Sequence, residues 1–335
     1  MNIFLQLQQL DRRWIYLMLS IAIIIPLMIP FNSKSYTTKP TEDLYRMIDS
    51  FAPDILATDS KEIADMKAID NDRAVLLEFY HDASTMPELF PMELQILRHC
   101  FERRIKVFTL TFYAAGAPII DLAINTVKES YPDVRSGVDY INFGYKVPAL
   151  YLPIILGMGE DIAQAIDIDA EGRKIANLPI MKNIKNYNEM NLVIECSGSS
   201  AGAGWYTYAR PRFGVNVAVG VTAVMAADTY PQLQAGQFIG MLAGLKGASE
   251  YEKLVDVFAT NHDPGKREFS KDRLREVTRH DEPPIDSNSK WPYAFRQARI
   301  GMNAQSVAHL LIIIFILIGN IGYFVQKHFH KHEQS

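Results

Sequence analysis

The chain has few cysteines and none of the short cysteine patterns that hold structural metals. Its 335 residues include 2 cysteines, Cys100 and Cys196, and there is neither a CxxC pair nor a Cys/His cluster at zinc spacing. A disulfide between the two would require a domain that faces an oxidising compartment. We expect both thiols to be buried as small apolar side chains, and we predict no metal and no cofactor.

The chain also lacks a basic excess and the commonest nucleotide-binding loops. It carries 34 Lys and Arg against 38 Asp and Glu, for a net charge of −4, whereas nucleic-acid-binding domains are usually basic. No G-x-x-x-x-G-K-[ST] sequence occurs, and no G-x-G-x-x-G follows the first predicted strand. Nucleic acid is therefore not among the predicted partners, and a Walker loop and the usual dinucleotide fingerprint are excluded.

What the chain does have is one long apolar run near each end. Residues 14–31 carry no charge, and residues 307–325 contain only His309 and Asn320 as strongly polar members. Each run is close to the length that crosses the hydrocarbon core of a bilayer. A cleaved signal peptide is the alternative for the first run, but no A-x-A-like site follows it. We predict two transmembrane helices and a lipid bilayer as partner.

The charges around these runs predict an orientation. The tails, residues 1–13 and 326–335, are basic next to the membrane, with Arg12 and Arg13 at one end and Lys327 and Lys331 at the other. The positive-inside rule then places both tails in the cytoplasm. Basic residues on the inner flanks of the runs favour the reverse, but they count less on a long translocated segment. We expect a bacterial inner membrane protein with an extracytoplasmic domain.

The segment between the two runs reads as one α/β domain. Residues 32–72 are predicted to form a linker and a helix, residues 73–260 the domain, and residues 261–306 a charged connector. Strands are predicted at 74–80, 106–113, 140–145, 191–196 and 215–226, and helices at 91–104, 119–129, 151–166, 205–210 and 234–258. Continuous apolar strands separated by helices indicate a parallel sheet covered on both faces. The predicted fold class is therefore α/β, a three-layer Rossmann-like domain with a mostly parallel sheet.

Polar residues that follow the predicted strands are candidates for a ligand site, because ligands bind beyond the carboxyl ends of parallel strands. These residues are Glu78, His81 and Asp82 after the first strand, Asp121 after the second, Glu195 to Gly204 at the fourth, and Asp228 after the fifth. The rule predicts a location and leaves the chemistry open.

The Gly-rich turn after the fourth strand has three interpretations. Gly198-Ser199-Ser200-Ala201-Gly202 matches G-x-S-x-G between a strand and a helix, and Asp228 and His262 follow in the order of a catalytic triad with Ser200. The same turn, through Gly198, Ser199, Gly202 and Gly204, could instead bind an anion or a nucleotide with its backbone N–H groups. The simplest interpretation is a flexible connection.

Two further features predict contacts with other chains. Gly236, Gly240 and Gly244 recur every four residues, on one face of the predicted helix. Such spacing allows close helix packing, within the domain or against a partner. His309 and Asn320 are costly in lipid, so they are expected to face protein. Other membrane proteins or a second copy of the chain are the predicted partners.

Several segments together resemble an uncharacterised bacterial family of two-pass membrane proteins with a central Rossmann-like α/β domain. These segments are Asp11-Arg12-Arg13, PELFPMELQILRHCFERRIKV, ILGMGEDI, GVTAVMAADTYPQLQAGQFIGMLAGLKGASEYEKLV and MNAQSVAHLLIIIFILIGNIGYF. The resemblance implies this architecture and no particular activity. At the level of architecture alone, the chain is also similar to the membrane-tethered auxiliary subunits of gliding-type ABC transport systems.

Three functional hypotheses follow. The first is a non-enzymatic subunit or scaffold of a membrane protein complex, since no convincing catalytic set is visible. The second is a membrane-tethered serine hydrolase that uses Ser200. The third is a module that binds a small ligand or a nucleotide at the turn from Gly198 to Gly204.

Overall fold

The computed structural model describes residues 11–29, 31, 36–56, 58–199, 202–261, 267–280 and 293–333. The chain divides into two compact units. One unit is Lys34–Arg299, and the other combines Met1–Ser33 with Ile300–Ser335.

The larger unit contains a six-stranded sheet in which every pair of neighbouring strands is parallel. The strands are β1 (Ala74–Tyr80), β2 (Lys106–Thr111), β3 (Tyr140–Tyr145), β4 (Leu192–Ser197), β5 (Asn216–Val221) and β6 (Met241–Ala243). Their order across the sheet is β3-β2-β1-β4-β5-β6. This is the strand order of the doubly wound dinucleotide-binding fold, in which the winding reverses between β1 and β4. The predicted α/β class with a parallel sheet is confirmed.

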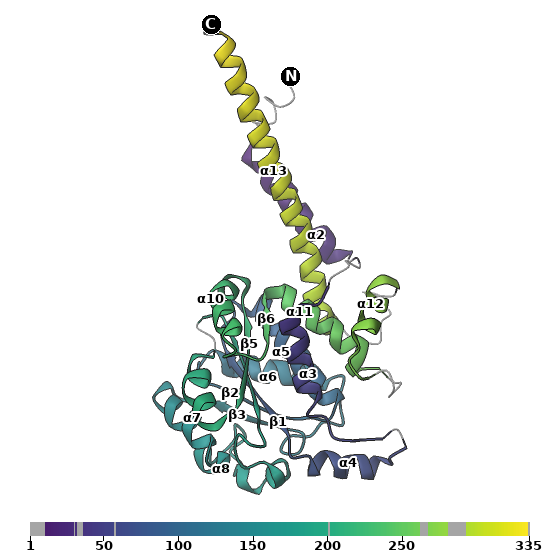
Figure 1. Ribbon diagram of the computed structural model, residues 1–335, viewed down its shortest axis with the longest axis vertical. Helices are drawn as coiled ribbons and strands as arrows, with labels where there is room; N and C mark the ends of the chain where they lie inside the picture. The colour runs from purple at the N-terminus through teal and green to yellow at the C-terminus, as the bar shows by residue number, and fades with distance from the viewer. Residues whose placement is uncertain are drawn as a thin grey trace. The chain divides into compact units, whose positions relative to one another are not determined.

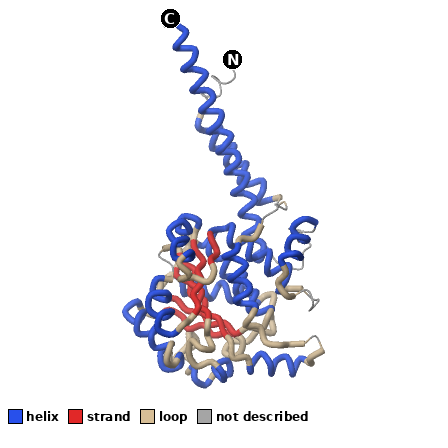
Figure 2. The backbone as a smooth tube through the Cα atoms, viewed as in Figure 1, coloured by secondary structure: helices blue, strands red, loops and turns tan. Residues whose placement is uncertain are grey.

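Helices cover both faces of the sheet (Figures 1 and 2). The first face packs against α3 (Lys39–Asp49), α5 (Met86–Glu102), α6 (Gly116–Lys128), α11 (Gly244–Leu254) and the π-helical η5 (Val255–Ala259). The second face packs against α7 (Tyr151–Met158), α8 (Ile162–Ala165), η2 (Ile175–Asn177), η3 (Pro179–Asn183), the π-helical η4 (Trp205–Ala209), α9 (Arg210–Phe213) and α10 (Ala223–Gln234). The short, exposed η1 (Pro148–Leu150) precedes α7. The unit also contains the helices α4 (Lys61–Asp70) and α12 (Lys271–His280) and the short η7 (Tyr293–Arg296).

Burial on both faces explains the composition of the strands. In β1, Leu77 and Phe79 belong to the apolar core of the first face, while Leu76 belongs to that of the second. Successive side chains of a strand point to opposite faces, so a strand covered on both sides is apolar at nearly every position. The charged exceptions in such strands, Glu78 in β1 and Glu195 in β4, are therefore informative.

Two predicted elements differ from the structure. The strand predicted over 215–226 ends at Val221, and its second half is the start of α10. The helix predicted over 234–258 is wrong at its beginning: Gly236 follows α10 with a φ of +72°, Gly240 precedes β6, and Gly244 begins α11. The three glycines therefore do not share a helix face. A three-residue strand such as β6 is too short to produce a periodicity of its own.

A cluster of buried charges lies where η5 meets α5 and the residues before Ile300. Arg98 Nη2 is 2.8 Å from Asp256 Oδ1, and Arg299 bonds to both Asp256 and Glu252. Burial raises the pKa of Asp256, but Arg98, Arg299 and Arg296 more than offset this, so the pKa lies below its usual value. Arg296 and Arg299, predicted to belong to a charged connector, are in fact buried and ion-paired.

The smaller unit contains α2 (Arg12–Met28) and most of α13 (Gln297–Glu333). Asp11 caps α2, because its side chain accepts a hydrogen bond of 2.9 Å from Arg13 N. Among the described residues, the segment Gln297–Phe324 is the one helix long and apolar enough to cross a membrane. The helix α2 is apolar and largely exposed but has 17 residues. The structure thus supports one candidate span, near the C-terminus, and the second anchor stays a prediction.

Candidate functional site

The chain reverses its winding between β1 and β4, and this arrangement opens the sheet at one edge. After β1 the chain crosses to the first face and enters α5, and after β4 it crosses to the second face and enters η4. The two connections diverge, so a space remains beyond the carboxyl ends of these two strands. In open parallel sheets this is where ligands bind.

Two adjoining cavities occupy this place. The first, here called the polar cavity, measures about 350 Å³ and is lined by Tyr80, His81, Asp82, Ser84, Thr85, Tyr113, Gly198 and Ser199. The second, here called the aromatic cavity, measures about 540 Å³ and is lined by Tyr80, Phe112, Pro148, Tyr151, Leu152, Glu195, Ser199, Ala203, Gly204, Thr207 and Tyr208. Tyr80 and Ser199 line both cavities, so the two spaces adjoin at these side chains.

In the polar cavity, both ring nitrogens of His81 already have partners. Nε2 lies 2.8 Å from Glu93 Oε1 on α5, and Nδ1 lies 3.1 Å from the backbone oxygen of Asp82. Burial alone would lower the pKa of His81, but the neighbouring Glu93 raises it above its usual value. Burial raises the pKa of Glu93 to about 7 against the opposing effect of His81. His81 is thus held in place as part of a buried pair.

Asp82, the acidic residue in the lining of the polar cavity, accepts hydrogen bonds from neighbouring side chains and from its own loop. Its Oδ1 accepts hydrogen bonds from Ser84 N at 2.8 Å and from Ser84 Oγ at 2.6 Å. Tyr113 Oη donates to its other oxygen at 3.3 Å. These bonds from Ser84 and Tyr113 lower the pKa of Asp82, so the carboxylate is ionised at neutral pH.

Beside the aromatic cavity lies the most unusual feature of the site, a pair of buried glutamates, of which Glu195 lines the cavity. Glu78 and Glu195 are register partners on the neighbouring strands β1 and β4, and neighbouring strands lie about 4.8 Å apart. Both side chains point to the second face of the sheet. Glu78 is fully buried and Glu195 is 3% exposed. Trp205 Nε1 of η4 donates a hydrogen bond of 2.5 Å to Glu78 Oε2.

Burial dominates the protonation of this pair. It raises the pKa of Glu78 to about 8, against the opposing hydrogen bond from Trp205. Burial, followed by the charge of Glu78, raises the pKa of Glu195 well above its usual value, although the Gly202 N–H and the Ser197 hydroxyl act in the opposite direction. Two carboxylates this close cannot both ionise without repulsion. At neutral pH the pair therefore retains protons.

The Gly-rich turn leads into η4 and lines one side of the aromatic cavity. Gly204 precedes η4, and a Cβ at this position would lie 2.2 Å from the hydroxyl oxygen of Tyr151. Only glycine allows the turn to approach Tyr151 this closely. Ser199 N donates a hydrogen bond of 3.2 Å to Ser197 Oγ, and Ser199 itself is exposed at the edge of the sheet.

The structure brings together some of the predicted site residues and separates others. His81, Asp82, Gly198 and Ser199 meet in the polar cavity, and Gly204 lines the aromatic cavity with Ser199. Glu78 does not join His81, because Glu78 bonds to Trp205 on the second face while His81 bonds to Glu93 of α5 on the first.

The predicted catalytic set stays a prediction. Ser200 and His262 lie outside the described residues, and Asp228 is exposed on α10. Asp121, also nominated from its place after the second strand, lies in α6 and accepts a hydrogen bond of 3.0 Å from Asn142 Nδ2. Among the residues that the structure describes, no group of three or more His, Cys, Asp or Glu side chains is arranged to hold a metal ion.

Sequence reasoning did not single out the aromatic side chains of the second cavity. Phe112, Tyr151 and Tyr208 come from three separate segments, and their convergence depends on how the chain crosses the sheet. The acidic pair could have been found from the sequence, since AVLLEFY and NLVIEC each place one carboxylate in an otherwise apolar strand. Such an acid is costly to bury unless it has a use or a partner.

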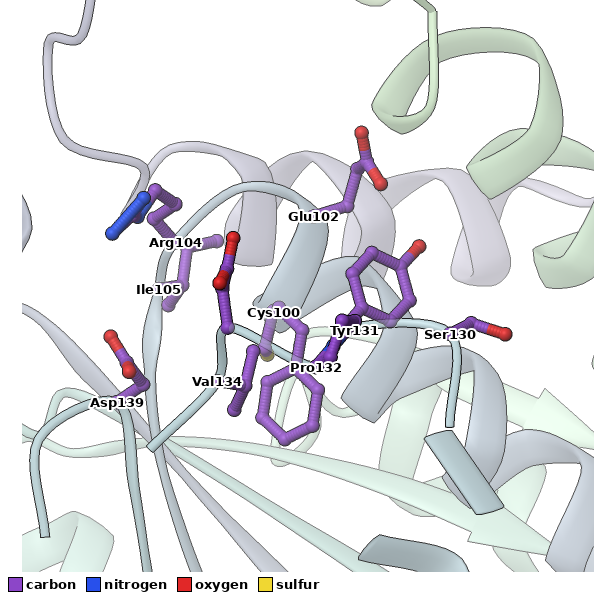
Figure 3. Close-up of a pocket in the computed structure, with 11 residues that line it drawn as sticks. Cys100, Glu102, Arg104, Ile105, Ser130, Tyr131, Pro132, Val134 and Asp139 are labelled. Atoms are coloured by element: carbon purple, nitrogen blue, oxygen red, sulfur yellow. The ribbon is translucent and has the colours of Figure 1, made fainter. Parts of the chain in front are cut away.

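A further cavity of about 290 Å³ lies at the opposite edge of the sheet (Figure 3). Its lining includes Ile105 and Asp139, which precede β2 and β3, and Cys100 near the end of α5. Burial raises the pKa of Cys100, so its thiol is unreactive. Because this cavity lies at the amino ends of the strands, it is the less favourable location for a ligand.

No protein-family model, curated protein or solved structure matches this chain.

The raised pKa of Glu78 predicts a specific dependence of stability on pH. The folded state binds this proton more tightly than the unfolded state, whose carboxyl titrates near 4.5. The contribution of Glu78 to the free energy of unfolding is thus fully present below pH 4.5 and is lost as the pH rises through about 8. We expect Glu78→Gln to reduce the fall in the free energy of unfolding across this interval by up to about 1.4 kcal/mol per pH unit.

Denaturant unfolding of the full-length protein in detergent at a series of pH values measures this effect. Glu129→Gln, at an exposed position that follows α6, is the matched control and should leave the pH dependence unchanged. An unchanged pH dependence in Glu78→Gln would show that Glu78 does not retain its proton in the folded state.

Proposed function

We propose that this chain is a membrane-anchored protein whose α/β domain binds a small organic ligand at the carboxyl edge of the sheet. The observation that supports this most directly is the pair of adjoining cavities beyond the ends of β1 and β4. The aromatic cavity, at about 540 Å³, falls within the range of about 300–1,000 Å³ that small-molecule sites occupy. Its lining also has the usual character of such sites, mostly apolar and aromatic with few polar groups.

In the polar cavity, the arrangement of polar groups favours binding over catalysis. A general base needs a nitrogen or oxygen free to take a proton from the substrate. Both ring nitrogens of His81 are engaged, and Asp82 is held by Ser84 and Tyr113. These contacts make the polar cavity a fixed surface that positions a ligand. The proposal thus develops the hypothesis of a ligand-binding module.

A variant that fills both cavities tests this proposal. Ser199 is exposed and lines both spaces, so Ser199→Trp is expected to obstruct them without disturbing the core. We expect some members of a panel of cationic, anionic and neutral metabolites to raise the melting temperature of the wild-type protein. Ser199→Trp should abolish those shifts, because the indole occupies the space of the ligand.

The matched control is Asn125→Trp, a substitution at an exposed position of α6 that lines neither cavity. It should leave the ligand-induced shifts intact. If no compound stabilises the wild-type protein, or if Ser199→Trp responds like the wild type, the proposed ligand site is wrong.

We also propose that the domain is anchored by two spans in the bacterial inner membrane, with both tails cytoplasmic and the domain outside. The helix α13 exposes a continuous apolar surface over the span segment, and α2, at 17 residues, reaches about 25 Å at 1.5 Å per residue. Arg296 and Arg299 are buried in ion pairs. Because acidic side chains of the domain balance their charges, these two arginines count less as basic residues that would keep the domain in the cytoplasm.

Cysteine labelling tests this orientation. Both native thiols are buried, so they contribute little background. Lys185→Cys, at an exposed position between η3 and β4, should react with a membrane-impermeant maleimide in cells whose inner membrane is intact. Labelling only after that membrane is permeabilised would reverse the proposed orientation, and release of the protein from membranes by alkaline carbonate would contradict the anchors.

A second candidate function, as a subunit of a membrane protein complex, is favoured by two polar residues of α13. His309 and Asn320 are both exposed. They are 11 residues apart, and at 100° per residue their directions differ by only about 20°. Polar groups on one face of a membrane helix usually contact protein. Another membrane protein or a second copy of this chain is the occupant that we propose for this face.

Replacing both residues tests the complex. We expect gentle extraction of the wild-type protein to recover a stoichiometric partner or a homo-oligomer, and His309→Leu with Asn320→Leu to release it, because the polar contacts are lost. The control pair, Ile314→Leu with Ile321→Leu, changes exposed positions on the other side of the helix and should retain the assembly. A wild-type protein that is monomeric and without partners would contradict this candidate.

A further inference from the structure

Four aromatic side chains stand in the lining of the aromatic cavity. Tyr80, Phe112, Tyr151 and Tyr208 line it, and Phe112 and Tyr151 meet edge to face with their ring centroids 4.6 Å apart. Aromatic rings carry partial negative charge on their faces, and a group of such rings around a site attracts cations. Apolar ligands would also fit such walls, so the rings alone do not identify the ligand.

The acidic pair supplies the second, independent observation. Within the described part of the chain, Glu195 Oε2 and Glu78 Oε1 are buried oxygens without a hydrogen-bond partner. Buried polar atoms in folded proteins nearly always have partners. Glu195 lines the cavity, so a group bound there is placed to satisfy its carboxyl.

Within the described part of the chain, no cationic side chain shifts the pKa of either glutamate. The groups that shift the pKa of Glu195 are Glu78, the Gly202 N–H and the Ser197 hydroxyl, and those that shift Glu78 are the Trp205 indole and a backbone contact with Phe112. The ionisable side chains whose pKa values are raised by one or both of the two carboxyls are Tyr80, Tyr151, Tyr187 and Cys196. None of these is a cation, so the positive charge that would let Glu195 give up its proton has to come from a bound group.

We propose that the ligand of the aromatic cavity is an organic cation, a protonated amine or a quaternary ammonium compound, whose charge lies among the four rings and faces Glu195. This inference rests on the proposed ligand-binding function and specifies its chemistry. An anionic ligand would oppose the ionisation of Glu195 and would be repelled by the ionised Asp82 of the adjoining cavity. Neutral polar ligands remain as an outcome of the test.

The same geometry links binding to a proton. A cation stabilises the ionised form of Glu195, so its binding expels a proton from the acidic pair into solvent. The affinity for a quaternary ammonium compound, which carries its charge at every pH, is therefore expected to increase with pH as long as Glu195 is protonated in the free protein. The increase approaches tenfold per pH unit when one proton is released.

The test compares cations with neutral analogues of the same shape. Choline and n-butylammonium are titrated calorimetrically into the full-length protein in detergent at several pH values, beside 3,3-dimethylbutan-1-ol and n-butanol. We expect a cation to bind at least tenfold more tightly than its neutral analogue, and more tightly as the pH rises. Glu195→Gln should remove this preference, whereas Glu160→Gln, at an exposed position after α7, should retain it.

The outcomes separate this inference from the function on which it rests. If the neutral analogues bind as tightly as the cations, or if Glu195→Gln retains the preference, the organic-cation inference is wrong while the cavity remains a ligand site. If neither cation binds but other panel compounds give shifts that Ser199→Trp abolishes, the inference again fails and the ligand site stands. If nothing in the panel binds, both fail. Tyr208→Leu, at a half-exposed ring of the cavity, should weaken cation binding even if Glu195→Gln does not fold.

Discussion

The structure depends on one constraint, the burial of a parallel sheet on both of its faces. This constraint requires helices on each side, and the chain can supply them only by reversing its winding between β1 and β4. The reversal separates the two connections at the carboxyl edge, where both candidate cavities lie. It also makes Glu78 and Glu195 register partners. The fold and the site are thus consequences of the same arrangement.

The protein buries charged side chains in two contrasting ways. On the first face, Asp256 and Glu252 lie among three arginines, Arg98, Arg296 and Arg299, which hold the pKa of Asp256 below its usual value although burial would raise it. On the second face, Glu78 and Glu195 have no such counterion in the described residues, and burial keeps them protonated. The first arrangement has its counterions among the described residues, whereas the second has none there and lies beside a cavity.

The sequence predicted the parallel sheet well, because β1, β2, β3 and β4 are long apolar segments between helical ones. It failed at β6, which has three residues and is defined by pairing with β5 and not by any local pattern. The location of the candidate site, at the carboxyl edge of the sheet, was predicted from the positions of His81, Asp82 and Ser199. The aromatic cavity was not, because Phe112, Tyr151 and Tyr208 meet only through tertiary packing. Local patterns determine strands, and topology determines which side chains converge.

The helix α5 has a mechanical consequence that follows from two of its contacts. Glu93 binds His81 at the polar cavity, and Arg98, five positions later, binds Asp256 in the buried charge cluster. Both residues follow Pro91, the one proline within the body of this helix, so they share one uninterrupted stretch of about 7.5 Å. A displacement of this stretch along its axis moves both contacts by the same amount. The helix therefore couples the two places: when Arg98 moves with the charge cluster, Glu93 and its contact with His81 at the edge of the sheet move with it.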